Sequence, residues 1–419
     1  MNSHSSSPAS RIQGRRSAPR LVLSLALGLA LPLAVPPATA VTLGEDVSAA
    51  LSRAAEQARV AAIRGEGQAV RRHAESLVAE DPSLRLKYLS DQLTDDTGAY
   101  EWEAMVDLPL WMPGQRGVRR EIAAALGGQA DALDRLLRWE MAGRVREVAW
   151  SAALALGRLR QTEQALKTAQ ALQDNVATRV EAGELPRVDL LLARQDALER
   201  EAERQAASLE AQDAMARYAQ LTGRTALPAP LLEPVGNAGS LPADHPLLGD
   251  AEGALVLARA ERDRAQRDRV GHPVLSLGGK RAQDQRGGDI QNMVQMEINI
   301  PFGLAAQSAP ELAAAERAYT ERSTQRHQVQ LEAERSLALA RLERQGADAA
   351  LAVAEQRHAL AQEALGLVRR AFDLGETDLT SLLRAEERAR EAGIALELSR
   401  LERGRAQARL NQALGVIPQ

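Results

Sequence analysis

The residue types that most often carry out chemistry in proteins are few in this chain, and their spacing fits no reaction. The six histidines show no HExxH motif, and there is no cysteine for a nucleophile, a metal site or a disulfide. The run Gly278-Gly279-Lys280 is similar to the end of a phosphate-binding loop, but Arg281 stands where a serine or threonine is needed. We therefore expect no catalytic residue, no metal and no cofactor, and we interpret this run as the end of a strand.

The chain is an internal duplication in which Gly183 corresponds to Gly375, an offset of 192 in residue number. Such a fixed period is the strongest single signal in the sequence. The same offset relates stretches that lie far apart within each half. It superposes the following pairs without a gap: Leu108-Pro109-Leu110 on Ile300-Pro301-Phe302, Gly183-Glu184 on Gly375-Glu376, Leu190-Leu191 on Leu382-Leu383, and Gly223 on Gly415. We predict a first repeat over residues 41–235 and a second over residues 236–419.

The N-terminal segment, residues 1–40, has the composition of a secretory signal peptide. Arginines precede the apolar run 21–33, and Ala38-Thr39-Ala40 fits a small-x-small cleavage site. A membrane anchor is the alternative, but the run is shorter than the roughly 20 residues needed to span a bilayer. Arg15-Arg16 also hints at a twin-arginine signal, with a poor continuation. This segment holds four arginines and no acid, so the formal charge of -4 becomes -8 after cleavage, which argues against binding to nucleic acid.

Most of the remaining chain has the apolar periodicity of long helices packed on small side chains. Only two phenylalanines occur, while alanine, leucine, arginine and glutamate dominate. We expect helices over about 45–80, 119–181, 187–221, 245–269 and 311–373, and a last one ending at Leu414. A helix of about 63 residues would be about 95 Å long, which indicates a coiled coil or a helical barrel. Gly183 and Gly375 are expected to form the tight turns between helices.

Two stretches alternate with the period of a β-strand and predict hairpins over residues 83–110 and 273–302. In the first hairpin, Glu101, Glu103 and Asp107 share one face, and Trp102 lies on the other. Four strands cannot close a barrel in lipid, so several copies must share one, and three copies would give 12 strands. The three acidic residues would then line a wet lumen, and Trp102 and Trp111 would lie at a membrane interface.

With these features in order, the chain resembles the outer membrane factor family, the TolC-like channels of Gram-negative efflux and type I secretion systems. The resemblance rests on these motifs: His245-Pro246, Pro273-Val274-Leu275-Ser276-Leu277-Gly278, Ile298-Asn299-Ile300-Pro301-Phe302, and the two Gly-Glu turns followed by Leu-Leu. It implies a mainly α fold with a small β-barrel part, namely a TolC-like α-helical barrel joined to a 12-stranded transmembrane barrel shared by a homotrimer. It also implies an outer membrane location with a periplasmic helical extension.

The resemblance further implies a periplasmic adaptor protein and an inner-membrane pump as partners, besides outer membrane lipid. The tips that would dock on the adaptor contain Gly183, Glu184, Leu185, Gly375, Glu376 and Thr377. In the family, acidic side chains of the second tip close the entrance, but here Ser381 and Arg384 occupy those positions, and only the first half keeps an acid, Asp189. Our hypothesis is a periplasmic gate in which Asp189 pairs with Arg384 or Arg194.

The resulting expectation is a passive exit duct for a tripartite efflux system or a type I secretion system. The resemblance leaves metal ions, drugs and small peptides open as cargo, because the family's selectivity lies mostly in the pump, here expected to be of the RND type for efflux. Overall similarity to members of metal systems suggests heavy-metal efflux, with drug efflux as the other choice, although no histidine, methionine or cysteine cluster supports a metal. The alternative is a secreted coiled-coil scaffold without a pore, which the helices alone would permit. The alternating runs favour the duct, because a scaffold has no need of them.

Overall fold

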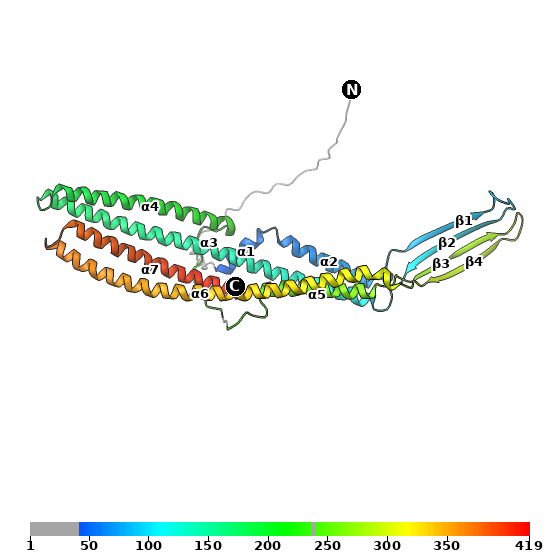
Figure 1. Ribbon diagram of the computed structural model, residues 1–419. Helices are drawn as coiled ribbons and strands as arrows, with labels where there is room; N and C mark the ends of the chain where they lie inside the picture. The colour runs from blue at the N-terminus through cyan, green and yellow to red at the C-terminus, as the bar shows by residue number, and fades with distance from the viewer. Residues whose placement is uncertain (1–41, 237–238) are drawn as a thin grey trace, which may run out of the picture. The chain divides into compact units, whose positions relative to one another are not determined.

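The computed structural model describes residues 42–236 and 239–419, and the predicted signal peptide lies outside these residues. The described residues form seven helices and four strands, which Figure 1 labels. In chain order these are α1 (Leu43–Ser52), α2 (Gln57–Glu75), β1 (Ser83–Ser90), β2 (Tyr100–Pro109), α3 (Gln115–Glu181), α4 (Arg187–Thr222), α5 (Pro246–Arg267), β3 (Val274–Gln283), β4 (Gln291–Asn299), α6 (Ala305–Asp373) and α7 (Leu379–Ala413).

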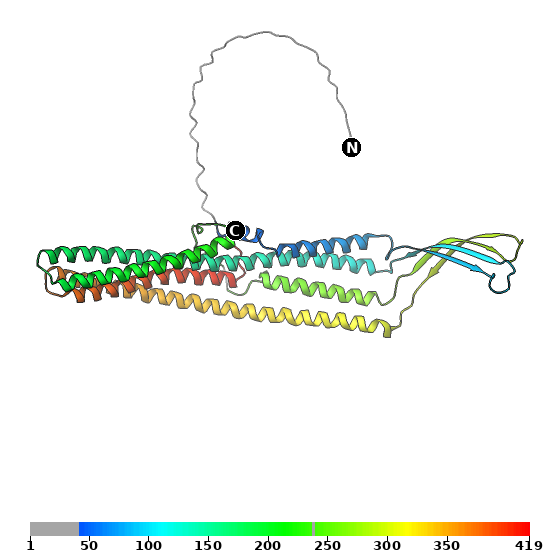
Figure 2. The ribbon, with the colours of Figure 1, turned by 90° about the horizontal axis from the view of Figure 1, so that it is seen from above.

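The helices form two long hairpins, α3 with α4 and α6 with α7, which lie side by side in both views (Figures 1 and 2). The shorter α2 and α5 pack along the part of α3 nearest the strands, and α5 also packs on α6. Small side chains line the contacts: Ala130, Ala142, Ala149 and Ala152 of α3 are fully buried. Because alanine lets helix axes approach closely, this composition supports long, thin helical layers.

The four strands form one antiparallel sheet in the order β1-β2-β3-β4, beyond the ends of α2, α3, α5 and α6 (Figure 2). Within the first hairpin Leu84 lies opposite Val106, and within the second Leu275 lies opposite Ile298. The two hairpins are joined through β2 and β3, where Leu108 lies opposite Leu275. Strands β1 and β4 are therefore the two edges of the sheet in a single chain.

The duplication is visible in the element boundaries. Helices α3 and α6 end at 181 and 373, α4 and α7 begin at 187 and 379, and α2 and α5 end at 75 and 267, so every pair keeps the offset of 192. The register of the first strands differs: Leu84 corresponds to Leu275, an offset of 191. Compared with the first half, the second half therefore has one residue fewer before its first strand and one residue more in its hairpin turn. The division into repeats at residues 235 and 236 stays a prediction.

Two equivalent joints connect the helical hairpins to the shorter helices. Gly223 ends α4 with a φ of 75°, and the guanidinium of Arg53 leaves no room for a Cβ there. Gly415 follows α7 with a φ of 77°, and the ring of His245 leaves no room for a Cβ there. Both pairs are related by the offset of the duplication. The buried His245 also begins α5, since its Nδ1 accepts a hydrogen bond from the backbone N–H of Leu247 at 3.2 Å.

Two helix predictions were wrong in detail. The single helix expected over 45–80 is broken at residues 53–56, because α1 packs on both α3 and α4, whereas α2 packs on α3. The second long helix begins at Ala305 and contains Pro310, where the sequence predicted a start at residue 311. Proline there removes one hydrogen bond near the exposed end of the helix, which is cheaper than a break in its middle.

Candidate functional site

One face of the sheet carries acidic side chains that are held by basic side chains across the strands. Asp107 accepts two hydrogen bonds from the guanidinium of Arg85, at 2.7 and 3.1 Å, and one from the hydroxyl of Ser276. Glu101 lies 2.5 Å from Nζ of Lys280 and 3.3 Å from Nζ of Lys87. Such opposite-charge pairs on neighbouring strands stabilise a sheet, and they leave this face charged but nearly balanced.

The sequence analysis placed Glu101, Glu103 and Asp107 on one face, and the structure brings them together there. Glu103 lies 3.5 Å from Nζ of Lys87. Lys280 also belongs to this set, which the sequence did not predict, because its place depends on the pairing of β2 with β3, where Glu103 lies opposite Lys280. The run that is similar to a phosphate loop lies in the middle of β3, not at the end of a strand as predicted, because β3 continues to Gln283 between β2 and β4. Its lysine binds a neighbouring carboxylate.

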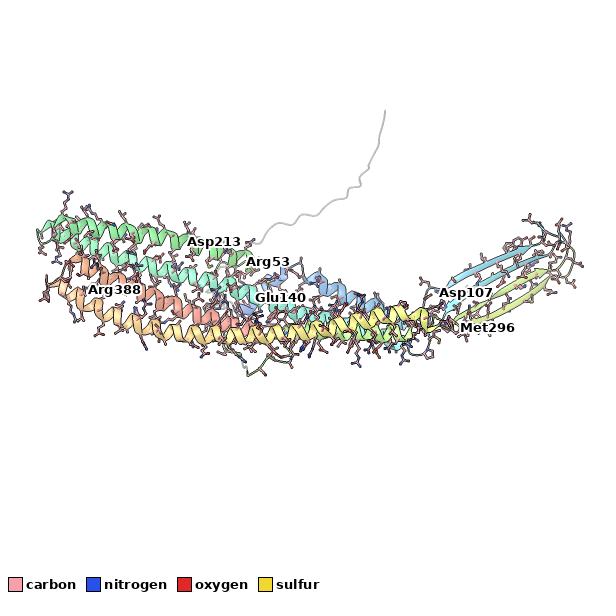
Figure 3. The ribbon with its side chains drawn as sticks, in the orientation of Figure 1. Arg53, Asp107, Glu140, Asp213, Met296 and Arg388 are labelled. Atoms are coloured by element: carbon pink, nitrogen blue, oxygen red, sulfur yellow. The ribbon has the colours of Figure 1, made fainter. Side chains whose placement is uncertain are left out.

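The other face of the sheet is apolar and exposed. Tyr88 and Trp102 stack there with ring centroids 4.5 Å apart. Large exposed apolar side chains on this face come from all four strands: Leu84, Leu86, Tyr88, Trp102, Val106, Leu277, Val294, Met296 and Ile298. Figure 3 shows Asp107 of the polar face and Met296 of the apolar face in the part of the sheet near the helices. An exposed apolar patch of this extent marks a surface that another molecule or a membrane covers.

Trp111 lies at the joint between sheet and helices rather than on the exposed face. Its indole N–H donates a hydrogen bond to the carbonyl of Ser76 at 3.1 Å, and its ring lies between His73 and His272. The guanidinium of Arg119 stacks over the same ring at 4.9 Å. These contacts fix the direction in which the strands leave the helices.

The two predicted tip turns have the same backbone. Gly183 and Gly375 both have a φ of 78°, and nothing lies within 4 Å of the position of a Cβ at either glycine. Glu184 donates its N–H to the carbonyl of Arg179, and Glu376 donates to Ala371, both at 2.8 Å. This 6→1 hydrogen bond with glycine in the left-handed conformation is the Schellman motif that ends a helix.

The tips pack on one another through a small apolar cluster. Its buried members are Val176, Ala193, Phe372, Leu379 and Leu382. The guanidinium of Arg179 from the first tip lies over the ring of Phe372 from the second, 5.0 Å from its centroid. Leu185 and Thr377 are half-buried, whereas Glu184 and Glu376 are exposed. The turns therefore present backbone and acidic groups outward while their apolar residues hold the two hairpins together.

The predicted gate residues lie near the tips but do not pair within one chain. In residues 42–236 and 239–419, Asp189 has no ion-pair partner, and neither Arg384 nor Arg194 contacts it. The backbone N–H of Ser381 donates to the carboxylate of Asp378 at 2.8 Å, which caps α7. A hydrogen bond from the Ser381 side chain, together with this backbone hydrogen bond and the nearby Arg384, lowers the pKa of Asp378. Arg384 thus lies near the start of its own helix, and its pairing with Asp189 stays a prediction.

A cluster of ion pairs, which sequence reasoning did not find, links the two hairpins above the tips. Arg200 of α4 is buried and lies 2.7 Å from Glu203 and 3.1 Å from Glu387 of α7. Arg390 of α7 lies 3.5 Å from Glu203 in return. Backbone packing joins α7 to α3 and α6, so these side chains supply the link between α4 and α7.

A half-open cavity of about 330 Å³ lies beside this cluster, between α3, α4, α6 and α7. Glu386 lines it and lies 2.5 Å from the guanidinium of Arg369. Burial raises the pKa of Glu386, whereas the hydrogen bond from Arg390 lowers that of Glu387. The bundle here is held by charges over a polar cavity rather than by a dry core.

Neither a metal centre nor a helical membrane span is found in the parts of the chain that the structure describes. Within residues 42–236 and 239–419, no three histidine, aspartate or glutamate side chains converge as metal ligands would. None of the described helices has a stretch long and apolar enough to cross a bilayer.

Comparison with known proteins identifies the second half of the chain by sequence and the whole fold by structure. Residues 239–416 match the family of outer membrane efflux proteins. No curated protein matches the sequence.

Solved structures of outer membrane proteins match the fold over 89% of the chain. CusC, which forms a transmembrane channel, is 19% identical with a TM-score of 0.68, over 92% of its own chain. The outer membrane protein VceC of Vibrio cholerae is 17% identical with a TM-score of 0.68, over 96% of its chain. The outer-membrane channel OprN is 20% identical with a TM-score of 0.67, over 89% of its chain. At these identities the similarity establishes the TolC-like fold, as the sequence predicted.

Proposed function

We propose that this protein is the outer membrane channel of a tripartite efflux or type I secretion system, a passive exit duct through the outer membrane and the periplasm. The observation that carries the proposal is the two-sided sheet. One face holds the ion-paired Glu101, Glu103 and Asp107, and the other exposes large apolar side chains. A sheet between water and lipid needs this division, because charged side chains are costly in hydrocarbon and tolerated in a wet lumen.

The channel would be a homotrimer in which three four-stranded sheets share one barrel. Both edge strands are free to pair, since β1 and β4 each have one neighbour in the chain. Helix α6 supports self-association with a row of exposed apolar residues separated by multiples of seven: Leu339, Val353, Leu360, Leu367 and Leu374. A seven-residue repeat is the pattern by which helices pack side by side in a coiled coil.

The helical tips would dock on a periplasmic adaptor protein that leads to an inner-membrane pump. The turns at Gly183 and Gly375 are exposed, and they present Glu184 and Glu376 outward on a fixed backbone. An adaptor could bind such a pair of turns through backbone and side-chain hydrogen bonds together. With the tips in the periplasm, the sheet would lie in the outer membrane, where lipid covers its apolar face.

The gate would form between copies of the chain rather than within one. Asp189, which is half-buried, has no ion-pair partner in the described chain, and Arg384 is exposed. An ion pair at a narrow, partly desolvated neck is stronger than one on an open surface. Replacing Arg384 with alanine should then raise the conductance of the pore. Equal conductance of Arg384→Ala and the wild type would overturn this gate and leave the channel itself untouched.

The channel is tested by extracting the mature protein from the outer membrane fraction in detergent and measuring its native mass and its conductance in a planar bilayer. We expect the mass of three chains and stepwise conductance. A water-soluble monomer without conductance would contradict the proposal and favour the coiled-coil scaffold.

A further inference from the structure

We infer that β4 of one copy pairs antiparallel with β1 of the next copy in one defined register, with Ile300 opposite Leu84 and Glu297 opposite Lys87. The inference rests on the proposed function, because it needs a barrel shared by several copies. It goes beyond that function by naming the residues that meet at the interface. It also completes the polar face, because Glu297 has no ion-pair partner within the described residues of one chain.

The register follows from the joint between the two halves of the chain. The sheet passes from the first half to the second through β2 and β3, where Leu108 lies opposite Leu275 and Met105 lies opposite Gly278. If the copies continue the sheet as the halves do, β4 takes the place of β2 and the next copy's β1 takes the place of β3. The same geometry would then repeat at every joint around the barrel.

The strand offsets convert this equivalence into residue pairs. The second strand of each hairpin keeps the offset of 192 and the first has an offset of 191, as the pairs Leu84–Val106 and Leu275–Ile298 show. The counterpart of Leu108 in β4 is therefore Ile300, and the counterpart of Leu275 in β1 is Leu84. By the same offsets, Glu297 is the counterpart of Met105, and Lys87 is the counterpart of Gly278.

The chemistry of the two edges fits this register. Apolar residues meet on the exposed face, where Ile298 lies opposite Leu86 and Met296 opposite Tyr88. A shift by one residue would bring the apolar face of one strand against the polar face of the other. A shift by two would keep the faces but place Glu297 opposite Arg85, whose guanidinium Asp107 holds at 2.7 and 3.1 Å. Lys87 is held less closely, since its Nζ lies 3.3 Å from Glu101 and 3.5 Å from Glu103, so it is the better partner for a further carboxylate.

The same offset between the two halves predicts a second contact between copies, this time between helices. Within the chain, α3 and α7 approach so closely that a Cβ on Gly157 would lie 2.6 Å from Cδ1 of Leu401. Their counterparts under the offset of 192 are Ala349 on α6 and Leu209 on α4. Leu209 is 68% exposed in a single chain and Ala349 is also exposed, so both are free to be covered by a neighbouring copy.

Disulfide cross-linking tests the register. Because the chain has no natural cysteine, only the introduced cysteines can form a disulfide. The double variant Gln295→Cys with Leu89→Cys places cysteines directly opposite each other in the inferred register. Two matched controls shift the register by two residues: Gln295→Cys with Lys87→Cys, and Glu297→Cys with Leu89→Cys. Directly opposed residues have Cα atoms about 4.5–5.5 Å apart, within disulfide reach, whereas residues two further along are roughly 7–8 Å apart.

Any disulfide between these positions must join two copies, since β1 and β4 are separated by two strands, or roughly 14 Å across the sheet. After mild oxidation of outer membranes, we expect the first variant to give covalent dimers and trimers at least tenfold above either control. The pair Ala349→Cys with Leu209→Cys should cross-link in the same way.

Preferential cross-linking of a control pair would overturn the register and leave the trimeric channel standing. No cross-link in any variant, with the native mass of three chains retained, would overturn the pairing of β4 with β1 in the same way. A native mass of one chain would overturn the proposed function together with the inference.

Discussion

Replacing Arg200 with methionine should weaken the contact between α4 and α7 of the two helical hairpins and favour the open state of the proposed channel at its tip end. The side chain of Arg200 is only 7% exposed, and the carboxylates of Asp196, Glu203 and Glu387 lie within 3.1 Å of its guanidinium. Methionine keeps much of the volume but leaves these carboxylates without their main positive partner. The loss falls on the link between α4 and α7, because Glu387 is the partner on the other hairpin.

The size of the effect follows from the burial of the two partners. Breaking a fully buried ion pair costs about 3–5 kcal/mol, whereas an exposed pair contributes about 1 kcal/mol or less. Arg200 is buried, but Glu387 is 39% exposed and retains Arg390 as a partner. We therefore expect about 1–2 kcal/mol for the link between hairpins, which corresponds to roughly a 5- to 30-fold increase in the ratio of open to closed channel.

The assay is single-channel recording of the purified protein in a planar bilayer, with the fraction of time open as the readout. Arg388→Met is the matched control, since Arg388 lies next to Glu387 on α7, is exposed, and has no ion-pair partner among the described residues (Figure 3). A double-mutant cycle with Glu387→Gln isolates the interaction energy of the pair. If Arg200→Met and Arg388→Met gave the same open fraction, the cluster would not hold the hairpins together and the reasoning would be wrong.

Three further predictions concern the lumen, the joint at the second repeat and the tip. Lys280→Gln should shift the reversal potential of the pore toward cation selectivity, because it leaves the lumen acids in excess, while Arg281→Gln on the opposite face should not. Burial lowers the pKa of His245 in the folded state. Below pH 6.5 the unfolded chain therefore binds the proton more readily, and the free energy of unfolding falls by up to about 2 kcal/mol by pH 5. His245→Asn should reduce the corresponding fall in melting temperature between pH 7 and pH 5. Gly375→Ala should cost about 1–2 kcal/mol through its positive φ and speed proteolysis at the tip, whereas Gly366→Ala, inside α6, should not.

Local patterns in the sequence were enough to predict the elements and the turns. The alternation around Glu101 predicted a strand with one acidic face, and the repeated glycines predicted helix ends at Gly183 and Gly375, because each signal depends on neighbours along the chain. The break between α1 and α2 was not predictable in this way. It depends on Arg53 covering Gly223, a contact between positions far apart in the sequence.

Pairings between elements carried the information that the sequence could not supply. The place of Lys280 beside Glu101 requires the register of β2 against β3. The offset of 191 for the first strand of each hairpin also appears only in the register, since the helices before the hairpins end with an offset of 192. The link from Arg200 to Glu387 requires the packing of two helices that are distant in the sequence, and helical periodicity does not determine which helices meet.

The duplication preserves backbone geometry at the tips while the side chains diverge. Helix α4 begins after Pro186, which fixes φ and needs no N–H, whereas α7 begins after Asp378, whose carboxylate accepts the N–H of Ser381. Proline and aspartate are two chemical solutions for the same helix start, and both turns keep the same φ and the same 6→1 hydrogen bond. The two tips therefore offer a partner the same backbone but different charges. Any preference of a partner for one tip must then come from the side chains that flank the turns rather than from the turns themselves.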